Sequence, residues 1–201
     1  MTLENKLNIT NSAQLAQMEE KISKKRAVEL FENNMLDNFP AGTYAALAVI
    51  HKYLFEEIYD FAGKLRTVNI AKGNFRFVPV LYLEEALKNI DAMPQRNFDE
   101  IVEKYVEINV AHPFREGNGR STRIWLDDIL KKEIQKVVDW SKVNKVDYLL
   151  AMERSPIKDI EIKMLLKEAL TDKINDRAVY MKGIDASYNY EGYSEFVAER
   201  L

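Results

Sequence analysis

The residues with the clearest chemical potential lie in one window, 109–123, which reads NVAHPFREGNGRSTR. His112 follows a broadly apolar helical stretch, 97–111, which we expect to be buried and therefore to place the imidazole rigidly. The turn Gly117–Gly119 has a glycine on either side of its asparagine, so successive backbone N–H groups there can form an anion nest. Because the next helix begins at this turn, the positive end of its dipole faces the same concavity.

Three charged side chains complete this window. Arg120 and Arg123 lie three positions apart on one helix face and supply two cationic groups. Glu116 adds a hard oxygen ligand, and proteins usually hold Mg²⁺ with one or two carboxylates, phosphate oxygens and water. Each feature alone also has a structural interpretation, such as an ion pair of Arg123 with Asp127. Their coincidence in one short window predicts Mg-nucleotide binding and group transfer at a phosphorus centre.

The composition excludes several other kinds of chemistry. The 201 residues include no cysteine and only two histidines, His51 and His112, which rules out thiol nucleophiles, zinc–thiolate sites and three-histidine metal sites. His51 lies in the apolar stretch 43–61, and we assign it to the core. The glycines form neither a P-loop nor a dinucleotide-binding fingerprint.

Charge and hydropathy set expectations for partners and compartment. The 29 basic and 32 acidic residues give a net charge of −3, so we expect no direct nucleic-acid binding. The longest apolar run, Tyr44–Ile50, is too short to cross a bilayer, and the first ten residues lack the apolar core of a secretion signal. We therefore expect a cytoplasmic protein with no membrane partner.

Hydrophobic periodicity predicts a mostly helical chain. The expected helices span 12–33, 43–61, 82–92, 97–111, 120–136, 145–154, 158–170 and 184–191. Between them, 65–80 alternates in polarity around the turn Lys72-Gly73-Asn74 and predicts a β-hairpin. The expected architecture is one all-α domain with one hairpin, comprising an N-terminal extension (1–40) and a core (41–175).

The window at 109–123 resembles the Fic family motif H-x-F-x-[D/E]-G-N-G-R-x-x-R at all eight specified positions. These positions are His112, Phe114, Glu116, Gly117, Asn118, Gly119, Arg120 and Arg123. The resemblance extends over about 40–195 and implies the Fic fold, with the hairpin 66–78 as a flap beside the active site. It also implies a protein adenylyltransferase, which moves AMP from ATP to a hydroxyl of a target protein and releases pyrophosphate.

The resemblance assigns roles to the motif residues. His112 would be the general base, buried Phe114 would fix the loop, and Glu116 would hold Mg²⁺ or another divalent cation. Gly117–Gly119 would cradle the phosphates, while Arg120 and Arg123 would bind their β/γ end. The full expected nucleotide-binding set is Lys72, Asn109, Gly117, Asn118, Gly119, Arg120, Ser121, Thr122 and Arg123. Gly119 fits the family pattern for AMP transfer rather than transfer of a terminal phosphate.

The resemblance also gives expectations for partners. The open edge of the flap 66–78 would pair with the backbone of the target protein by strand addition. Type II topoisomerases are one candidate class of target, and we expect a homo-oligomer.

The tail residues 187–192, SYNYEG, match the Fic inhibitory pattern [S/T]-x-x-x-E-[G/N], with Gly192 at its end. Ser187 and Glu191 lie four apart and share one helix face. The resemblance implies that the helix 184–192 is autoinhibitory, with Glu191 pairing with Arg123 and depriving the γ-phosphate of a cationic partner. Tyr188 and Tyr190 on the same helix are candidate acceptors for self-AMPylation.

Two alternative functions use the same residues. The site could run in reverse and remove AMP from a modified protein, with Glu191 orienting a water. It could also be a non-catalytic module that senses nucleotide, although binding alone requires no base such as His112.

Overall fold

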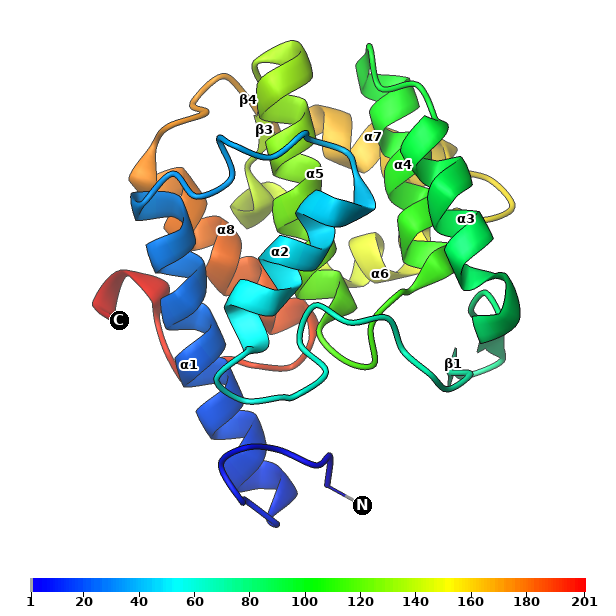
Figure 1. Ribbon diagram of the computed structural model, residues 1–201. Coiled ribbons are helices and arrows are strands. Elements are labelled where there is room, and N and C mark those ends of the chain that lie inside the picture. Colours follow the sequence, from blue (N-terminus) through cyan, green and yellow to red (C-terminus); the bar gives the residue numbers. More distant parts are fainter. Residues whose placement is uncertain (1) are drawn as a thin grey trace.

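Eight α-helices make up most of the chain in the computed structural model, which describes residues 2–201 (Figure 1). They are α1 (Ser12–Glu32), α2 (Tyr44–Phe55), α3 (Val80–Ala92), α4 (Phe98–Ala111), α5 (Asn118–Ile134), α6 (Lys145–Arg154), α7 (Ile160–Glu168) and α8 (Arg177–Tyr190). Short 3₁₀ helices span Trp140–Lys142 and Ala198–Arg200. The predicted all-α fold class is confirmed. Across residues 2–201, none of the helices combines the length and apolar character needed to cross a bilayer.

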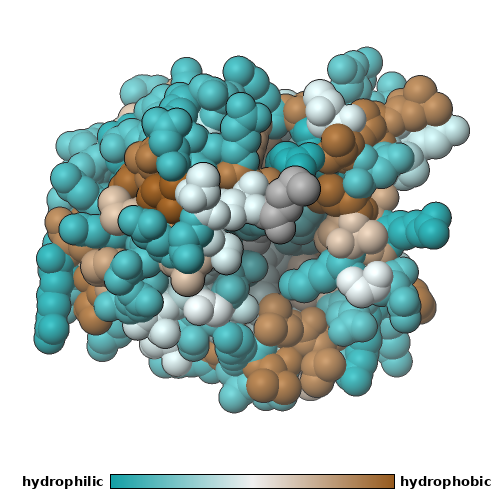
Figure 2. Space-filling view, turned by 90° about the horizontal axis from the view of Figure 1, so that it is seen from below, coloured by the Kyte–Doolittle hydropathy of each residue, from teal (hydrophilic) through white to brown (hydrophobic). Residues whose placement is uncertain are grey.

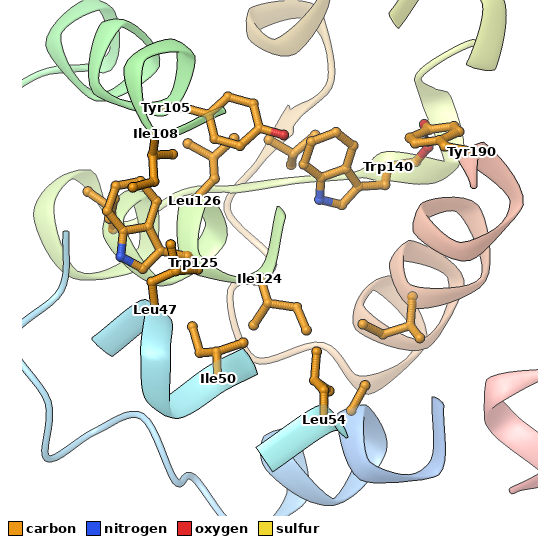
Figure 3. Packing of buried hydrophobic residues seen from close by; sticks show 14 of the residues in the cluster. Leu47, Ile50, Leu54, Tyr105, Ile108, Ile124, Trp125, Leu126, Trp140 and Tyr190 are labelled. Carbon is orange, nitrogen blue, oxygen red and sulfur yellow. The ribbon is translucent and has the colours of Figure 1, made fainter. Parts of the chain in front are cut away.

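Helix α5 forms the centre of the fold, and most of its residues from Asn118 to Leu130 are buried. Trp125, Leu126 and Ile129 are fully buried, and the helix packs against α2, α4 and α8. In Figure 3, Trp125 lies between Leu47 of α2 and Ile108 of α4. This packing holds the N-terminal end of α5, where the motif loop joins it, in a fixed place.

Two predicted helix boundaries are wrong. The helix expected over 43–61 ends at Phe55, because the following segment folds back so that the backbone N–H of Gly63 donates to His51 Nδ1 at 2.9 Å. The last helix begins at Arg177 rather than at 184, because the Asp176 side chain caps its first turn. Its interior Gly183, which weakened the sequence signal, lies against Trp140.

The strands also differ from the prediction of one longer hairpin. The flap contains only β1 (Ala71–Lys72) and β2 (Phe75–Arg76), paired antiparallel with Lys72 opposite Phe75. A second pair, β3 (Val137–Val138) and β4 (Leu170–Thr171), was not predicted. Its two-residue strands lie far apart in the sequence, so no local alternation marks them.

The flap projects from the end of the molecule at which α4 ends and α5 begins (Figure 1). Seen from below, the surface is mainly hydrophilic, with separate hydrophobic groups between the polar side chains (Figure 2). At this end Arg115 of the motif loop is exposed, whereas Pro113 and Phe114 beside it are buried.

Candidate active site

His112 is placed by the end of α4. It adopts the left-handed conformation at φ +49° as the C-cap of this helix, which turns the chain away from the helix axis. Its Nδ1 lies 3.3 Å from the carbonyl oxygen of Asn109. Because a carbonyl can only accept, Nδ1 carries the proton and Nε2 keeps a free lone pair. The ring also stacks on Phe77 of the flap at 3.8 Å between centroids.

The imidazole of His112 is uncharged at neutral pH. Burial is the main cause that lowers its pKa to about 4, and the charges of Arg66 and Lys72 lower it further. The Asn109 carbonyl and the carboxylate of Glu191 oppose this effect. At neutral pH the side chain is therefore a free base.

His51 of α2 contacts two residues of the motif loop. Its burial was predicted and is confirmed, since it is fully inaccessible. The ring stacks on Phe114 at 3.8 Å, and Nε2 donates to the carbonyl oxygen of Glu116 at 2.8 Å. Burial lowers the pKa of His51 to about 3, so the ring stays neutral. The sequence showed its burial but gave no sign of this loop contact.

The motif asparagine ties the loop to itself. Asn118 Oδ1 accepts from the backbone N–H of Phe114, and its Nδ2 donates to the Phe114 carbonyl, at 2.9 and 2.8 Å. Gly117 lies at φ +75°, and a Cβ there would come within 2.5 Å of the Phe55 ring. The loop thus requires glycine at this position.

The first turn of α5 is open to an anion. The N-cap residue Gly117 has no side chain that could accept hydrogen bonds from the first N–H groups of the helix, which leaves them for an anion. The side chains of three residues in the predicted nucleotide-binding set already make hydrogen bonds inside the protein. Asn118 bonds to Phe114, and Ser121 Oγ donates to the Gly117 carbonyl. Thr122 Oγ1 lies 3.3 Å from both Asn109 Oδ1 and the Gly119 carbonyl oxygen and can donate its one hydrogen to either. Of these three residues, Asn118 has a backbone N–H in the first turn that can take part in a phosphate cradle, whereas the Ser121 N–H donates to the Gly117 carbonyl at 3.1 Å.

Arg120 was predicted to bind the phosphates, and in this structure its side chain is engaged within the protein. Its side chain is 1% exposed and makes a 2.6 Å ion pair with Glu19 of α1. Its guanidinium lies over the rings of Phe55, Tyr188 and Tyr193. Arg120 therefore joins α5 to α1 and to the tail.

The carboxylate of Glu19 lies at the centre of this buried cluster. It also accepts hydrogen bonds from the hydroxyl groups of Tyr59 and Tyr193. Burial raises the pKa of Glu19, but Arg120 and these hydroxyls together lower it below its usual value. Glu19 was not predicted as a contributor, because nothing local marks a contact with a residue so distant in the sequence.

Arg123 is held by the tail. Its Nη2 lies 2.8 Å from Glu191 Oε1 and 2.9 Å from the Ser187 carbonyl oxygen, and its Nε donates to Ser187 Oγ at 2.6 Å. A Cβ on Gly119 would collide with the same Glu191 oxygen. The Glu191 carboxylate therefore lies directly over the first turn of α5. Although burial raises the pKa of Glu191, Arg123 and other cations lower it overall, so the group is ionised.

The remaining predicted residues lie around this centre. Lys72 is exposed on β1, yet near enough for its charge to act on both His112 and Glu191. Asn109 is engaged within the scaffold, where its Nδ2 donates to the Tyr105 carbonyl at 2.7 Å. Gly192 follows α8 at φ +94° with open space around it.

The candidate acceptor tyrosines are buried in this conformation. Tyr188 is fully buried and its hydroxyl donates to Ser23 Oγ at 2.9 Å. Tyr190 is 6% exposed and its hydroxyl donates to the Val143 carbonyl at 2.8 Å. Either hydroxyl could react only after α8 had left its place.

Glu116 fits the role of a metal ligand that works with a bound nucleotide. Its side chain is 43% exposed, and Oε1 takes hydrogen bonds from the Gly117 N–H and from Arg120. Within residues 2–201 no group of three or more histidines or acids is placed to hold a metal by itself. A divalent cation here would thus need phosphate oxygens and water as further ligands.

Comparisons with known proteins agree with this geometry. The model of the Fic/DOC family matches residues 42–130. Protein adenylyltransferase VbhT of Bartonella schoenbuchensis is 30% identical over 199 residues, and the match covers 90% of this chain and 40% of that protein. The chain thus spans less than half the length of this relative. Probable protein adenylyltransferase Fic of Salmonella typhimurium is 30% identical over 138 residues, covering 63% of this chain and 66% of that protein.

A solved structure extends the agreement to the fold. The N-terminal Fic domain of a VirB-translocated Bep effector protein from Bartonella quintana, crystallised with bound ADP, is 21% identical. It superposes with a TM-score of 0.72, and the match covers 85% of this chain and 91% of that one. From the motif, the fold and these similarities together, the chain belongs to the Fic/DOC family.

Proposed function

We propose that this protein transfers AMP from ATP to a hydroxyl of a target protein, and that Glu191 holds it inactive until the tail moves. One observation carries the proposal: the ionised Glu191 carboxylate lies over the first turn of α5 and pairs with Arg123, near enough for its charge to act on the neutral His112. A carboxylate in an anion nest occupies the place that a phosphate would take. The adenylyltransferase names of the relatives and the ADP bound to the Bartonella quintana domain support this interpretation.

The chemistry follows from the geometry of His112. Its free Nε2 takes the proton of the target hydroxyl as that oxygen attacks the α-phosphorus of ATP. The bond from the α-phosphorus to the bridging oxygen breaks, and pyrophosphate leaves. A divalent cation held by Glu116 and the phosphates would neutralise negative charge. The N–H groups of α5 and the freed Arg123 orient the phosphates and stabilise the charge that develops.

The flap offers a place for the target. β1 and β2 form an isolated two-stranded pair, so their outer edges have no partner strand among residues 2–201. A target segment that adds to this edge would lie beside His112, because Phe77 of the flap stacks on that ring.

Replacing His112 by alanine in the Glu191→Gly background should abolish pyrophosphate release while leaving ATP binding intact. The base is lost, but the phosphate cradle on α5 does not depend on the imidazole. Calorimetry for ATP binding and a coupled assay for pyrophosphate measure the two effects separately. Transfer that persists in this variant would assign the base to another residue.

The pH dependence of the reaction should reflect the low pKa of His112. We expect kcat/KM to be level from neutral pH down to about pH 5 and then to fall about tenfold per unit below the pKa of about 4. The sign follows because protonation removes the lone pair that the reaction needs. Losing Glu191 removes a charge that raises this pKa, so the active variant should not titrate at a higher pH. An inflection near 6.5 would show that the histidine is not desolvated as described.

A further inference from the structure

Arg66 is a buried cation with an unusual set of partners. It is 4% exposed, and it forms no ion pair with any carboxylate of residues 2–201. Its guanidinium donates instead to four backbone carbonyls, those of Val68, Val78, Ala111 and His112. Such a group is costly to bury, so its carbonyl contacts must compensate for lost hydration.

These four carbonyls belong to two separate parts of the site. Val68 and Val78 lie on the two legs of the flap, whereas Ala111 and His112 end α4. The bond from Nε to the His112 carbonyl is 2.8 Å long, and that from Nη2 to Ala111 is 3.1 Å. The C-terminal end of α4 carries the negative end of the helix dipole, which favours a cation there. The fork shape of a guanidinium allows one side chain to bond both parts at once.

Backbone contacts reinforce the same junction. The N–H of Arg66 donates to the Pro113 carbonyl at 2.9 Å, and the N–H of Val78 donates to the Val110 carbonyl at 3.2 Å. The base of the flap is therefore attached to the last turn of α4 on both sides of His112. Figure 1 shows the flap strand beside this end of the molecule.

We propose that Arg66 is a positioning residue that fixes the imidazole of His112 relative to the flap. The inference rests on the proposed function, in which the flap brings the acceptor hydroxyl and His112 removes its proton. These two groups must meet within hydrogen-bond distance, and a displacement of about 1 Å can cost about 100-fold in rate. The Arg66 side chain bonds directly to backbone carbonyls of the flap and to those at the end of α4, which carries His112.

The test compares two substitutions of Arg66 with a matched control, all in the Glu191→Gly background. Arg66→Lys keeps the charge but cannot span the four carbonyls, whereas Arg66→Met removes both the charge and the fork. Arg96→Met is the control, because Arg96 lies just before the opposite end of α4 with its side chain 80% exposed. Three readouts are used: hydrogen exchange of the flap amides 66–78, the NMR signals of the two histidine rings, and pyrophosphate release from Mg-ATP.

For both Arg66 variants we expect flap amides to exchange at least about tenfold faster than in the control. The His112 ring signals should move as the ring leaves its stack on Phe77, while those of His51 stay in place. kcat should fall about 100-fold with the KM for ATP unchanged. If Arg66→Met does not fold, Arg66→Lys decides the question by the same readouts.

The proposal is overturned if both folded variants match the control in flap exchange and His112 signals, or if the loss is confined to the KM for ATP. A parent variant that releases no pyrophosphate would instead contradict the proposed function. In that case flap exchange and the histidine signals still decide whether Arg66 holds His112 against the flap.

Discussion

Glu191→Gly should raise the rate of AMP transfer by about 5- to 150-fold, the range expected for a regulatory coupling of 1–3 kcal/mol. The substitution removes the carboxylate that pairs with Arg123 Nη2, although this nitrogen keeps its bond to the Ser187 carbonyl. It also empties the space over Gly119, where the carboxylate now lies. ATP should then bind with its terminal phosphate on Arg123. The measurement is the initial rate of pyrophosphate release at saturating Mg-ATP.

The variant should remain folded, because Arg123 keeps its contacts with the Ser187 carbonyl and hydroxyl oxygens. Glu199→Gly is the matched control, since Glu199 is an exposed acid on the same tail with no contact to Arg123. The control should leave the rate unchanged. Equal rates for wild type and Glu191→Gly would remove the inhibitory role of the tail.

Glu19→Ala should lower the free energy of unfolding by about 3–5 kcal/mol, more than Glu19→Gln or Glu32→Ala. Without Glu19, the fully buried Arg120 would lose the ion pair at 2.6 Å and keep only the half-exposed Glu116 as a charged partner. Urea unfolding followed by circular dichroism measures the difference. Glu19→Gln should cost less, because the amide oxygen can still accept from Arg120.

The control for this prediction is Glu32→Ala on the same helix. Glu32 pairs with Arg177 of α8 at 3.0 Å, but both side chains are about half exposed. An exposed pair of this kind contributes about 0–1 kcal/mol. If the two substitutions cost the same, the buried pair is not the structural link between α1, α5 and the tail.

Lowering the pH should reduce the contribution of Glu19 to the free energy of unfolding. Its pKa in the folded protein lies below the usual value of 4.5, so the unfolded chain binds its proton first as the pH falls. The stabilisation is therefore complete above about pH 4.5 and is lost as the pH falls through the folded pKa. The Glu19→Gln variant should lack this part of the pH dependence.

The sequence predicted the features that local patterns encode. The period of apolar residues located most helices, and the motif spacing brought His112, Glu116 and the α5 turn to one place. The pattern in the tail also pointed to the pair of Glu191 with Arg123, which the structure contains. These features depend on residues whose types alone specify their chemistry.

The rest depends on contacts between distant segments. Arg120 was expected at the phosphates, but Glu19 lies 101 residues away along the chain and was not visible as its partner. Arg66 and His51 act through backbone carbonyls, which carry no side-chain signature. The pairing of β3 with β4 was not predicted for the same reason, since such two-residue strands pair only through the tertiary fold.

The most direct test of the account is the source of the label transferred to protein. Wild type, Glu191→Gly and Glu191→Gly/His112→Ala are incubated with Mg²⁺ and either α-labelled or γ-labelled ATP. An AMP transferase inhibited by Glu191 should label protein from the α position alone, most strongly with Glu191→Gly and not at all with the double variant. Label from the γ position, or none from either position, would contradict AMP transfer and turn the search to phosphate transfer or to removal of AMP from a modified protein.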